Sequence, residues 1–389
     1  MGTMAPLEER DRRIETLRMA MATEGFDAFL VAGKGHAWTG RGYLRYLTDF
    51  HLWGHDGLLL LPGAGACMMS LTSPRVAERV AARGWIDDVR GDAQLVRTIA
   101  DAVAAGGLSR ARIGIAGYEW IVAAGRLEAL RALLPYVTFE PVDHIFDTIR
   151  QIKSQLEVVQ SRELWDVMRT SMASFEHVLA PGISRRAAAA EAIRAAFSRG
   201  VRDMLVFVGE DLRDIDPPTE DLLRCDGMVR IHIEICGESG HWCERTMTYA
   251  FREPTDVEYA LQEAEIRAFG VVRAAALPGV TLAELSSVYG RTLEDHGFFA
   301  TGPSAHLDFH GQGLDANEYP LFSSADPEGT DPDAELAVGQ IFSYHPARPV
   351  VPPDVWGPDV HDNILIGHDG AERLSGDWDL RMIGRRAQG

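Results

Sequence analysis

The second half of the chain repeats an order of secondary-structure elements, and this repeat limits the possible folds more than any other feature. The segments LAPGISRRAAAAEAI (179–193) and ALPGVTLAELSSV (276–288) each predict a helix that ends at Pro-Gly and another that begins after Ser or Thr. In the second segment, TLAE has the spacing of a capping box. A pair of apolar strands follows each helix pair, at 229–251 and 340–367. The repeat predicts two halves related by a pseudo-two-fold axis, with a curved antiparallel sheet between four helices.

The first half has a different pattern, in which short apolar strands alternate with amphipathic helices. Apolar residues recur at helical spacing from Glu9 to Glu24, and Gly25 ends that helix. FDAFLVAG, GLLLLP and RIGIAG predict buried strands, and SPRVAERVAARG, QLVRTIADAVAAGG and AAGRLEALRALLP predict further helices. We therefore expect an α/β domain at 1–153 and a second domain at 154–389, which begins with a long helix.

Composition and charge exclude several classes of protein. The chain has 389 residues, of which 46% are hydrophobic and 24% charged, as in a globular protein large enough for two domains. A formal net charge of -19 disfavours nucleic acids and anionic membranes as partners and leaves a small-molecule substrate. The charged start predicts no signal peptide, and no apolar run is long enough to span a bilayer, so we expect a cytoplasmic protein.

The hairpin sequence RIHIEICGESGHWCERTMTYAF (230–251) places two glutamates on either side of a tight turn. Strand alternation puts three isoleucines on one face of its first strand and His232 and Glu234 on the other. With the turn at 237–240, Glu234 and Glu244 lie within about one step of the ladder and can bind one ion. The other interpretation is an exposed polar face without a ligand.

Three histidines stand at comparable places further along the chain. IFSYHPARP and DVHDNILIG put His345 and His361 at similar positions in the second strand pair. Between the two strand pairs, SAHLDFHGQGLDANEYP carries His310 among glycines and His306 four residues before it. Any one of these histidines alone would also fit a structural role in the core, but together with the two glutamates they predict a metal site.

The motifs resemble those of the creatinase and aminopeptidase P superfamily, which has the pita-bread fold. YLRYLTDF and IRQIKSQLEVVQ resemble its N-terminal domain and linker, and HLDFHGQGLDANEYP resembles its histidine-rich loop. GQIFSYHPARP and DVHDNILIGHDGAERLS resemble its two later metal-binding strands. The resemblance implies an α/β N-terminal domain followed by an α+β pita-bread C-terminal domain with a curved antiparallel sheet flanked by helices.

The family binds metal through Asp, Asp, His, Glu and Glu in that order. The resemblance carries these roles to Glu234, Glu244, His310, His345 and His361. Two glutamates and three neutral histidines supply a charge of about -2, which matches one divalent ion. We therefore expect one divalent transition metal ion, Fe, Zn, Mn or Co. His232 either joins these ligands or stands behind them.

Two departures from the peptidase pattern predict a different reaction. Asn317 stands where the peptidases have a second histidine in the loop, and DIDPPTED lacks their earlier histidine. The spacing of the two glutamates resembles the dimethylsulfoniopropionate lyase branch, and ERT (244–246) resembles a creatinase motif with a catalytic glutamate, here Glu244. We expect a non-peptidase lyase or hydrolase that cleaves a C–S or C–N bond in a small zwitterionic substrate.

Three alternatives remain: a non-haem iron enzyme that activates oxygen, an Xaa-Pro aminopeptidase or dipeptidase, and a metal-free ligand-binding module. Asp315 is the candidate base, and His306 either transfers protons or orients the histidine at 310. Asn317 is expected to contact substrate. Relatives often form a homodimer whose N-terminal domain closes the pocket, which predicts substrate contacts from Trp38, Arg45 and Trp53, although core packing also explains each aromatic residue.

Overall fold

The structure is a computed structural model that describes residues 5–35, 40–210, 216–224, 226–298, 307–322, 330–346 and 360–384. The chain divides into two compact units, Met1–Arg150 and Gln151–Gly389. None of the described helices is long and apolar enough to cross a membrane. The domain boundary expected after residue 153 stays a prediction.

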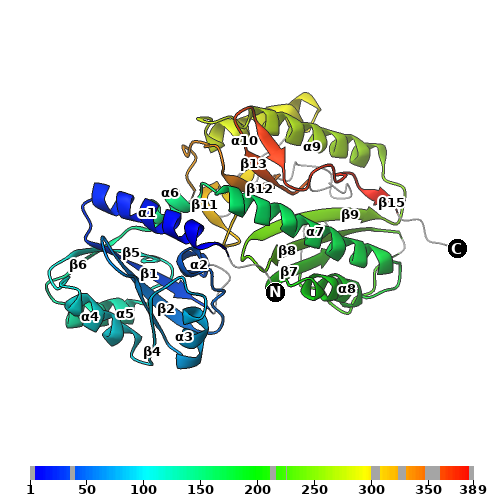
Figure 1. Cartoon of the computed structure of the whole chain (residues 1–389). Coiled ribbons are helices and arrows are strands. Elements are labelled where there is room, and N and C mark those ends of the chain that lie inside the picture. Colours follow the sequence, from blue (N-terminus) through cyan, green and yellow to red (C-terminus); the bar gives the residue numbers. More distant parts are fainter. Residues whose placement is uncertain are drawn as a thin grey trace. The chain divides into compact units, whose positions relative to one another are not determined.

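Among the described residues of the first unit, six strands form one mixed sheet in the order β4-β3-β2-β1-β5-β6 (Figure 1). β1 pairs antiparallel with β2 and parallel with β5, and the apolar runs of all three strands are buried. These three strands confirm the prediction from the sequence. The strands are β1 (Ala28–Lys34), β2 (Asp56–Pro62), β3 (Met68–Leu71), β4 (Asp88–Gly91), β5 (Arg112–Ala116) and β6 (Thr138–Pro141).

The part of this unit that the structure describes also contains six helices. α1 ends one residue before Glu24, and Gly25 follows with a φ of 72°, a backbone conformation that suits glycine. The expected helices appear as α1, α3, α4 and α5, whereas α2 and α6 were not expected. The helices are α1 (Leu7–Thr23), α2 (Gly42–Thr48), α3 (Pro74–Ala81), α4 (Leu95–Ala105), α5 (Ala124–Leu133) and α6 (Asp143–Arg150).

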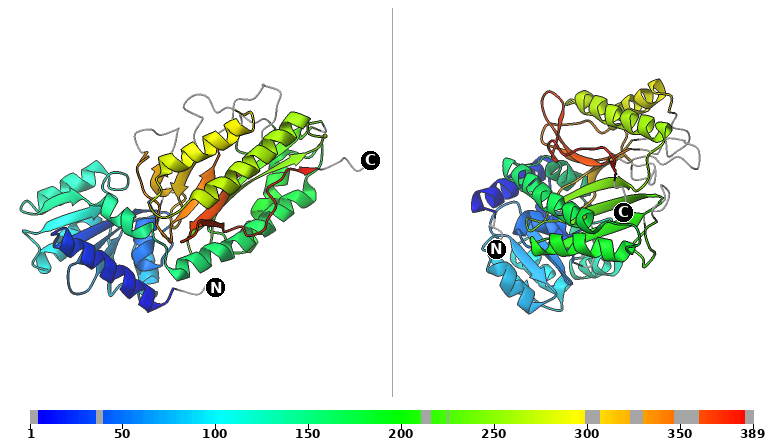
Figure 2. Two further views of the ribbon diagram at one scale, coloured as in Figure 1. Left: turned by 90° about the horizontal axis from the view of Figure 1, so that it is seen from above. Right: turned by 90° about the vertical axis from the view of Figure 1, so that its right-hand side faces the viewer.

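The described residues of the second unit form four long helices, two on each of two sheets (Figure 1 and Figure 2). Apolar side chains of α7 and α8 form one core with β7, β8 and β9, and those of α9 and α10 form another with β10, β12 and β13. This arrangement confirms the fold class and the repeat expected from the sequence. The helices are α7 (Gln155–Val178), α8 (Arg185–Ser198), α9 (Asp256–Ala275) and α10 (Leu282–Asp295).

The two sheets have the orders β15-β9-β8-β7 and β11-β10-β12-β13-β14. β8, β9, β12 and β13 are the expected strand pairs. β7, β10 and β11 were not expected, so His310 lies on a strand and not on a glycine loop. The strands are β7 (Asp203–Gly209), β8 (Met228–Cys236), β9 (Trp242–Ala250), β10 (Asp308–Gly311), β11 (Glu318–Phe322), β12 (Ile341–His345), β13 (Asp362–Ile366), β14 (Ala371–Arg373) and β15 (Ile383–Gly384).

Side chains and backbone join the two sheets where β9 meets β13. The backbone N–H of Glu244 donates to Oδ1 of Asn363 at 3.2 Å. One guanidinium nitrogen of Arg245 donates to the carbonyl oxygen of His361 at 2.9 Å. Glu244, which is expected to bind metal and lies on β9, is therefore next to the start of β13, which follows His361.

Candidate metal centre

The β8–β9 hairpin brings the two glutamates directly opposite each other. Glu234 is the cross-strand partner of Glu244, and His232 is the partner of Thr246. The isoleucines of β8 point into the core that this hairpin forms with α7 and α8. Strand alternation therefore leaves the histidine and the glutamates on the other face. This register confirms the spacing argument made from the sequence.

β10 carries His310, and β12 carries His345. Asp308 pairs with His345 across this ladder, and His310 pairs with Ser343, so the two histidines are diagonal neighbours on one face. Their Nε2 atoms are 3.0 Å apart. β12 in turn pairs with β13, which begins directly after His361.

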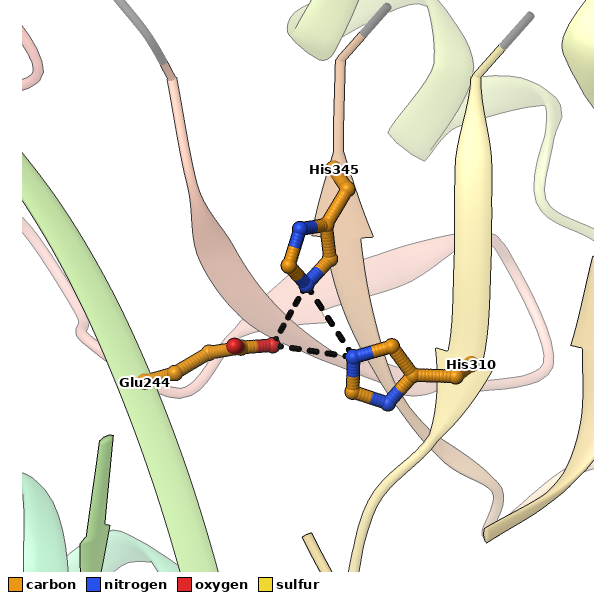
Figure 3. A group of neighbouring side chains, drawn as sticks. All are labelled: Glu244, His310 and His345. Atoms are coloured by element: carbon orange, nitrogen blue, oxygen red, sulfur yellow. Dashed lines mark hydrogen bonds and ion pairs between the residues drawn. The ribbon is translucent and has the colours of Figure 1, made fainter. Parts of the chain in front are cut away.

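Glu244, His310 and His345 form a compact cluster (Figure 3). Oε1 of Glu244 lies 2.8 Å from Nε2 of His345 and 3.3 Å from Nε2 of His310. The glutamate is almost fully buried, with 1% of its surface exposed, and His310 is also buried. Three ligand atoms from three strands thus converge on one point.

A second group of ligand atoms shares the same glutamate. Nε2 of His232 lies 3.3 Å from Oε1 of Glu234 and 3.8 Å from Oε2 of Glu244. One ligand atom from each of these residues lies within 4.8 Å of the other two. Burial acts to lower the pKa of His232, but the carboxylate of Glu234 raises it above its ordinary value. Each oxygen of Glu244 therefore faces a different group.

In the cluster of Glu244, His310 and His345, the glutamate and His345 shift each other's pKa. Burial would raise the pKa of Glu244, but His345 and His310 beside it hold that pKa well below its usual range. Burial would lower the pKa of His345, whereas Glu244 raises it above its ordinary value. The glutamate is therefore ionised at neutral pH, and its charge favours a cation at this point.

His361 lies beside both groups. Its ring centre is 4.3 Å from that of His345 and 5.6 Å from that of His232. Burial and these two neighbouring imidazoles hold the pKa of His361 well below its ordinary value. The compact ligand groups formed by the described residues do not include this side chain, so its expected role as a ligand stays a prediction.

The side chains present fit a divalent transition metal. Oε2 of Glu244 and Nδ1 of His361 are buried, and no described residue forms a hydrogen bond with either atom. Nδ1 of His310 contacts the carbonyl oxygen of Gly311 at 3.1 Å, which leaves its Nε2 as the ligand atom. Imidazole and carboxylate together suit Fe, Zn, Mn or Co better than Mg or Ca.

Arg245, the residue after the shared glutamate, holds β9 against β13. It donates to the carbonyl oxygen of His361 and lies 3.5 Å from Oδ2 of Asp362. The same carboxylate oxygen accepts hydrogen bonds from Arg373 at 2.8 Å and from Ser375 at 2.5 Å. Sequence reasoning missed this network, although the adjacent acidic and basic residues on two neighbouring strands were a usable signal.

The other expected residues lie in several places. Asp315 is buried in the turn between β10 and β11, where its backbone N–H donates to Glu318, and Asn317 is exposed on the same turn. In the first unit, Arg45 is buried 3.7 Å from Asp49, and Trp53 is 67% exposed. The catalytic and substrate-binding roles of these residues stay predictions. Trp38 and His306 lie outside the described residues.

Comparison with known families matches both halves of the chain. Residues 13–152 match the creatinase/prolidase N-terminal domain, and residues 160–368, more than half of the chain, match metallopeptidase family M24. The chain belongs to metallopeptidase family M24. Membership of this family implies divalent metal ions, in agreement with the metal dependence expected from the sequence.

Relatives within the M24 family have modest sequence identity to this chain. A Xaa-Pro dipeptidase from Pyrococcus horikoshii is 25% identical over 275 residues, which cover 67% of this chain and 72% of that protein. A putative dipeptidase from Bacillus subtilis is 26% identical over 136 residues, 35% of each chain. In the first three curated relatives, the matched region spans about a third to a half of the relative, from 34% to 46%.

Solved structures of this fold match nearly the whole chain. The prolidase from Pyrococcus horikoshii has a TM-score of 0.76 at 18% identity and covers 95% of this chain and 100% of its own. The X-Pro aminopeptidase from Thermotoga maritima has a TM-score of 0.80 at 17% identity, with 96% and 99% covered. These likenesses establish the shared fold.

The comparisons contradict the non-peptidase lyase or hydrolase expected from the sequence. Curated relatives are named Xaa-Pro dipeptidase, and structural neighbours are named prolidase, which favours the alternative of an Xaa-Pro dipeptidase. The absence of two histidines does not by itself exclude peptidase activity. The amide of Asn317 donates hydrogen bonds to a carbonyl as an imidazole does, so its presence does not exclude a peptide substrate.

Proposed function

We propose that this protein is a metal-dependent dipeptidase that hydrolyses Xaa-Pro dipeptides. The cluster of Glu244, His310 and His345 within an M24 fold carries the proposal, because its buried ligand atoms converge on one point. The names of the curated relatives support the substrate class. Dipeptides are small and zwitterionic at neutral pH, which agrees with the substrate size expected from the sequence.

The carboxylate and the two imidazoles of this cluster suit a metal ion that acts as a Lewis acid. When bound, a divalent Fe, Zn, Mn or Co ion would polarise the peptide carbonyl and lower the pKa of a water molecule. Glu244, His310 and His345 would hold this ion, and two neutral imidazoles with one carboxylate would leave about one positive charge uncompensated. That remaining charge favours the developing oxyanion of the substrate over a neutral carbonyl.

The turn between β10 and β11 supplies further groups for the proposal. We assign Asn317 to the substrate, because its exposed amide can donate a hydrogen bond to the peptide carbonyl. We assign Asp315 as the group that accepts a proton from the attacking water, since it is a buried carboxylate on this turn, whereas the neighbouring Glu318 is paired with Lys153. The leaving proline nitrogen takes up one proton as the peptide bond breaks.

The proposal is tested by the substrate range of the metal-loaded protein. Protein stripped with a chelator is reloaded separately with Mn, Zn, Co and Fe, and release of amino acids is measured with Ala-Pro, Ala-Leu and acetyl-Ala-Pro. We expect Ala-Pro to be cleaved in preference to the other two. Failure of every loaded form to release proline, or equal cleavage of Ala-Leu, would overturn the proposed specificity.

Assembly and location belong to the proposal as well. We infer a homodimer, because the resemblance implies that the first domain of one subunit closes the pocket of the other. We also infer a cytoplasmic protein that binds neither nucleic acid nor membranes, which the net charge of -19 supports. Sedimentation of the purified protein tests the homodimer, and a monomer at micromolar concentration would contradict it.

A further inference from the structure

The turn between β10 and β11, residues 312–317, bears the two side chains that the proposed function assigns to the substrate. The backbone N–H of Gln312 donates to the carbonyl oxygen of Ile341 at 2.9 Å, which joins the turn to the first residue of β12. The side-chain amide of Gln312 donates to the carbonyl oxygen of Ala316 at 3.3 Å, across the turn. These two bonds set the shape of the turn, and other contacts set its place relative to Glu244.

One group of contacts joins the turn to β9, the strand that carries Glu244. The backbone N–H of Trp242 donates to the carbonyl oxygen of Gly313 at 2.8 Å. Beside this bond, the side chains of Trp242 and Cys236 form a small buried apolar cluster with Ala316. Because Trp242 and Glu244 are two residues apart on one strand, they lie on the same face, and the turn is placed beside the candidate metal centre.

A buried ion pair holds the turn at its other end. Lys153 donates through Nζ to Oε2 of Glu318 at 2.5 Å, and both side chains are buried. Oε1 of the same carboxylate accepts the backbone N–H of Asp315 at 3.1 Å. A Cβ at Gly313 would lie 2.5 Å from Nζ of Lys153 and 2.6 Å from Oε2 of Glu318, so glycine allows the turn to pack directly against the pair.

The segment that carries Lys153 is itself held in place. The backbone N–H of Lys153 donates to the carbonyl oxygen of Gly339 at 2.9 Å. Ser154 then caps α7 together with Glu157, whose Oε1 lies 3.6 Å from Nε2 of His241 in the turn before β9. The start of α7 therefore contacts both the β8–β9 turn and, through Lys153, the β10–β11 turn.

We infer that Lys153 is a positioning residue, which orients Glu318 so that this carboxylate holds Asp315 at a fixed place relative to Glu244. This role rests on the proposed function, because that function assigns the turn to the substrate. One oxygen of Glu318 binds the lysine and the other binds the turn, so loss of the lysine frees the carboxylate to rotate away from the N–H of Asp315. A displacement of about 1 Å at a reacting group lowers a rate by on the order of 100-fold.

The first measurement follows the turn itself and does not use activity. Hydrogen–deuterium exchange of the metal-loaded protein is compared between the wild type and Lys153→Met. We expect peptides that cover residues 312–318 to exchange about 10-fold faster in the variant, with bound metal unchanged. Lys153→Arg keeps a cation that can bind the carboxylate and should restore most of the protection.

The second measurement is kcat for Ala-Pro with saturating metal. We expect kcat of Lys153→Met to fall by about 10-fold to 100-fold. Adding Asp315→Asn to Lys153→Met should lower kcat by less than Asp315→Asn does alone, because both changes act on one group. Arg252→Met is the matched control, since it removes the arginine that pairs with buried Glu258 on α9 and should reduce stability while kcat stays at the wild-type value.

A double variant separates positioning from stability. Lys153→Met with Glu318→Leu leaves neither charge buried alone, so it should unfold at nearly the wild-type urea concentration. Its turn should still exchange fast and its kcat should stay low, because the N–H of Asp315 has lost the Glu318 oxygen that accepts it.

Wild-type exchange or wild-type kcat in this double variant or in folded Lys153→Met would overturn the positioning role. An equal loss of kcat in Arg252→Met would overturn it as well. Absence of Ala-Pro cleavage by the wild type would overturn the proposed function, and the exchange rates would then still decide whether Lys153 holds the turn.

Discussion

Glu244 connects the two ligand groups at the scale of single residues. One of its oxygens faces His345 and His310, and the other faces His232, while its backbone N–H is fixed by Asn363 on the neighbouring sheet. This contact between the backbone of Glu244 and Asn363 helps to orient the Glu244 carboxylate toward the histidines. The position of this residue within the fold therefore decides which side chains can share an ion.

Replacing His345 tests the first cluster. We expect His345→Ala to lose the tightly bound ion without unfolding, because the histidine ends β12 and is partly exposed, outside the apolar core. Bound metal is measured by mass spectrometry after dialysis, and folding by circular dichroism. His368→Ala serves as the control, since its side chain is exposed. Unchanged metal in a folded His345→Ala would show that this histidine is not a ligand.

The sequence was enough to choose candidate ligands, whose roles stay predictions, but not to predict the contacts between them. Strand alternation was enough to place Glu234 opposite Glu244, because a tight turn fixes the register of a hairpin. His361 precedes β13, so alternation along the strand did not determine where its ring lies. The contact between His232 and Thr246 also requires the register of two strands together with side-chain rotamers.

At the scale of elements, the site depends on the meeting of β9 with β13. Arg245 follows Glu244 on β9, Asp362 follows His361 and begins β13, and both Arg245 and Asp362 are almost fully buried. Their ion pair is completed by Arg373 and Ser375, which lie on and just after β14. This network stabilises the alignment of the two sheets and, through it, the positions of the ligands.

Removing Arg245 is expected to destabilise the second unit. Arg245→Met leaves Asp362 buried with fewer partners, and we expect a loss of about 3 kcal/mol in the free energy of unfolding, at the low end for a broken buried pair because Arg373 and Ser375 remain. Urea denaturation measures the loss. Arg381→Met breaks an exposed pair with Glu263 and should cost less than about 1 kcal/mol. Equal losses in both variants would contradict the structural role of Arg245.

Some elements could not be predicted from the sequence, for physical reasons. The capping box of Thr281 and Glu284 was predicted and is present at the start of α10. β10 and β11 are short, and glycines between them remove the alternation that identifies a strand. α2 is buried on all sides, so it has no polar face from which helical periodicity could be recognised.

At the scale of the whole molecule, the second unit contains a buried ion pair that begins two residues after its first residue, Gln151. Lys153 and Glu318 are paired, with 3% and 5% of their side chains exposed, and Ile152 bridges to Gln340. Glu318 also accepts the backbone N–H of Asp315. The residues just before α7 thus contact Glu318, which binds the backbone of Asp315, and also pair with Gln340, just before β12.

Two fragments test where the second domain begins. We expect residues 151–389 to fold alone and to be more stable than residues 154–389, which lack Lys153 and leave Glu318 buried without its lysine. Urea denaturation of both fragments gives the comparison. Equal stability would favour the boundary after residue 153, and failure of both fragments to fold would show that the second unit depends on the first.

The central claim is that a metal ion held at Glu244 carries out dipeptide hydrolysis. The most direct test measures release of proline from Ala-Pro against bound metal as the metal-free protein is reloaded, for the wild type and for Glu244→Gln. The account predicts that wild-type activity is absent without metal and rises with the bound ion. Glu244→Gln should stay folded with less than about a hundredth of that activity. Full activity in metal-free protein, or in Glu244→Gln, would contradict the account.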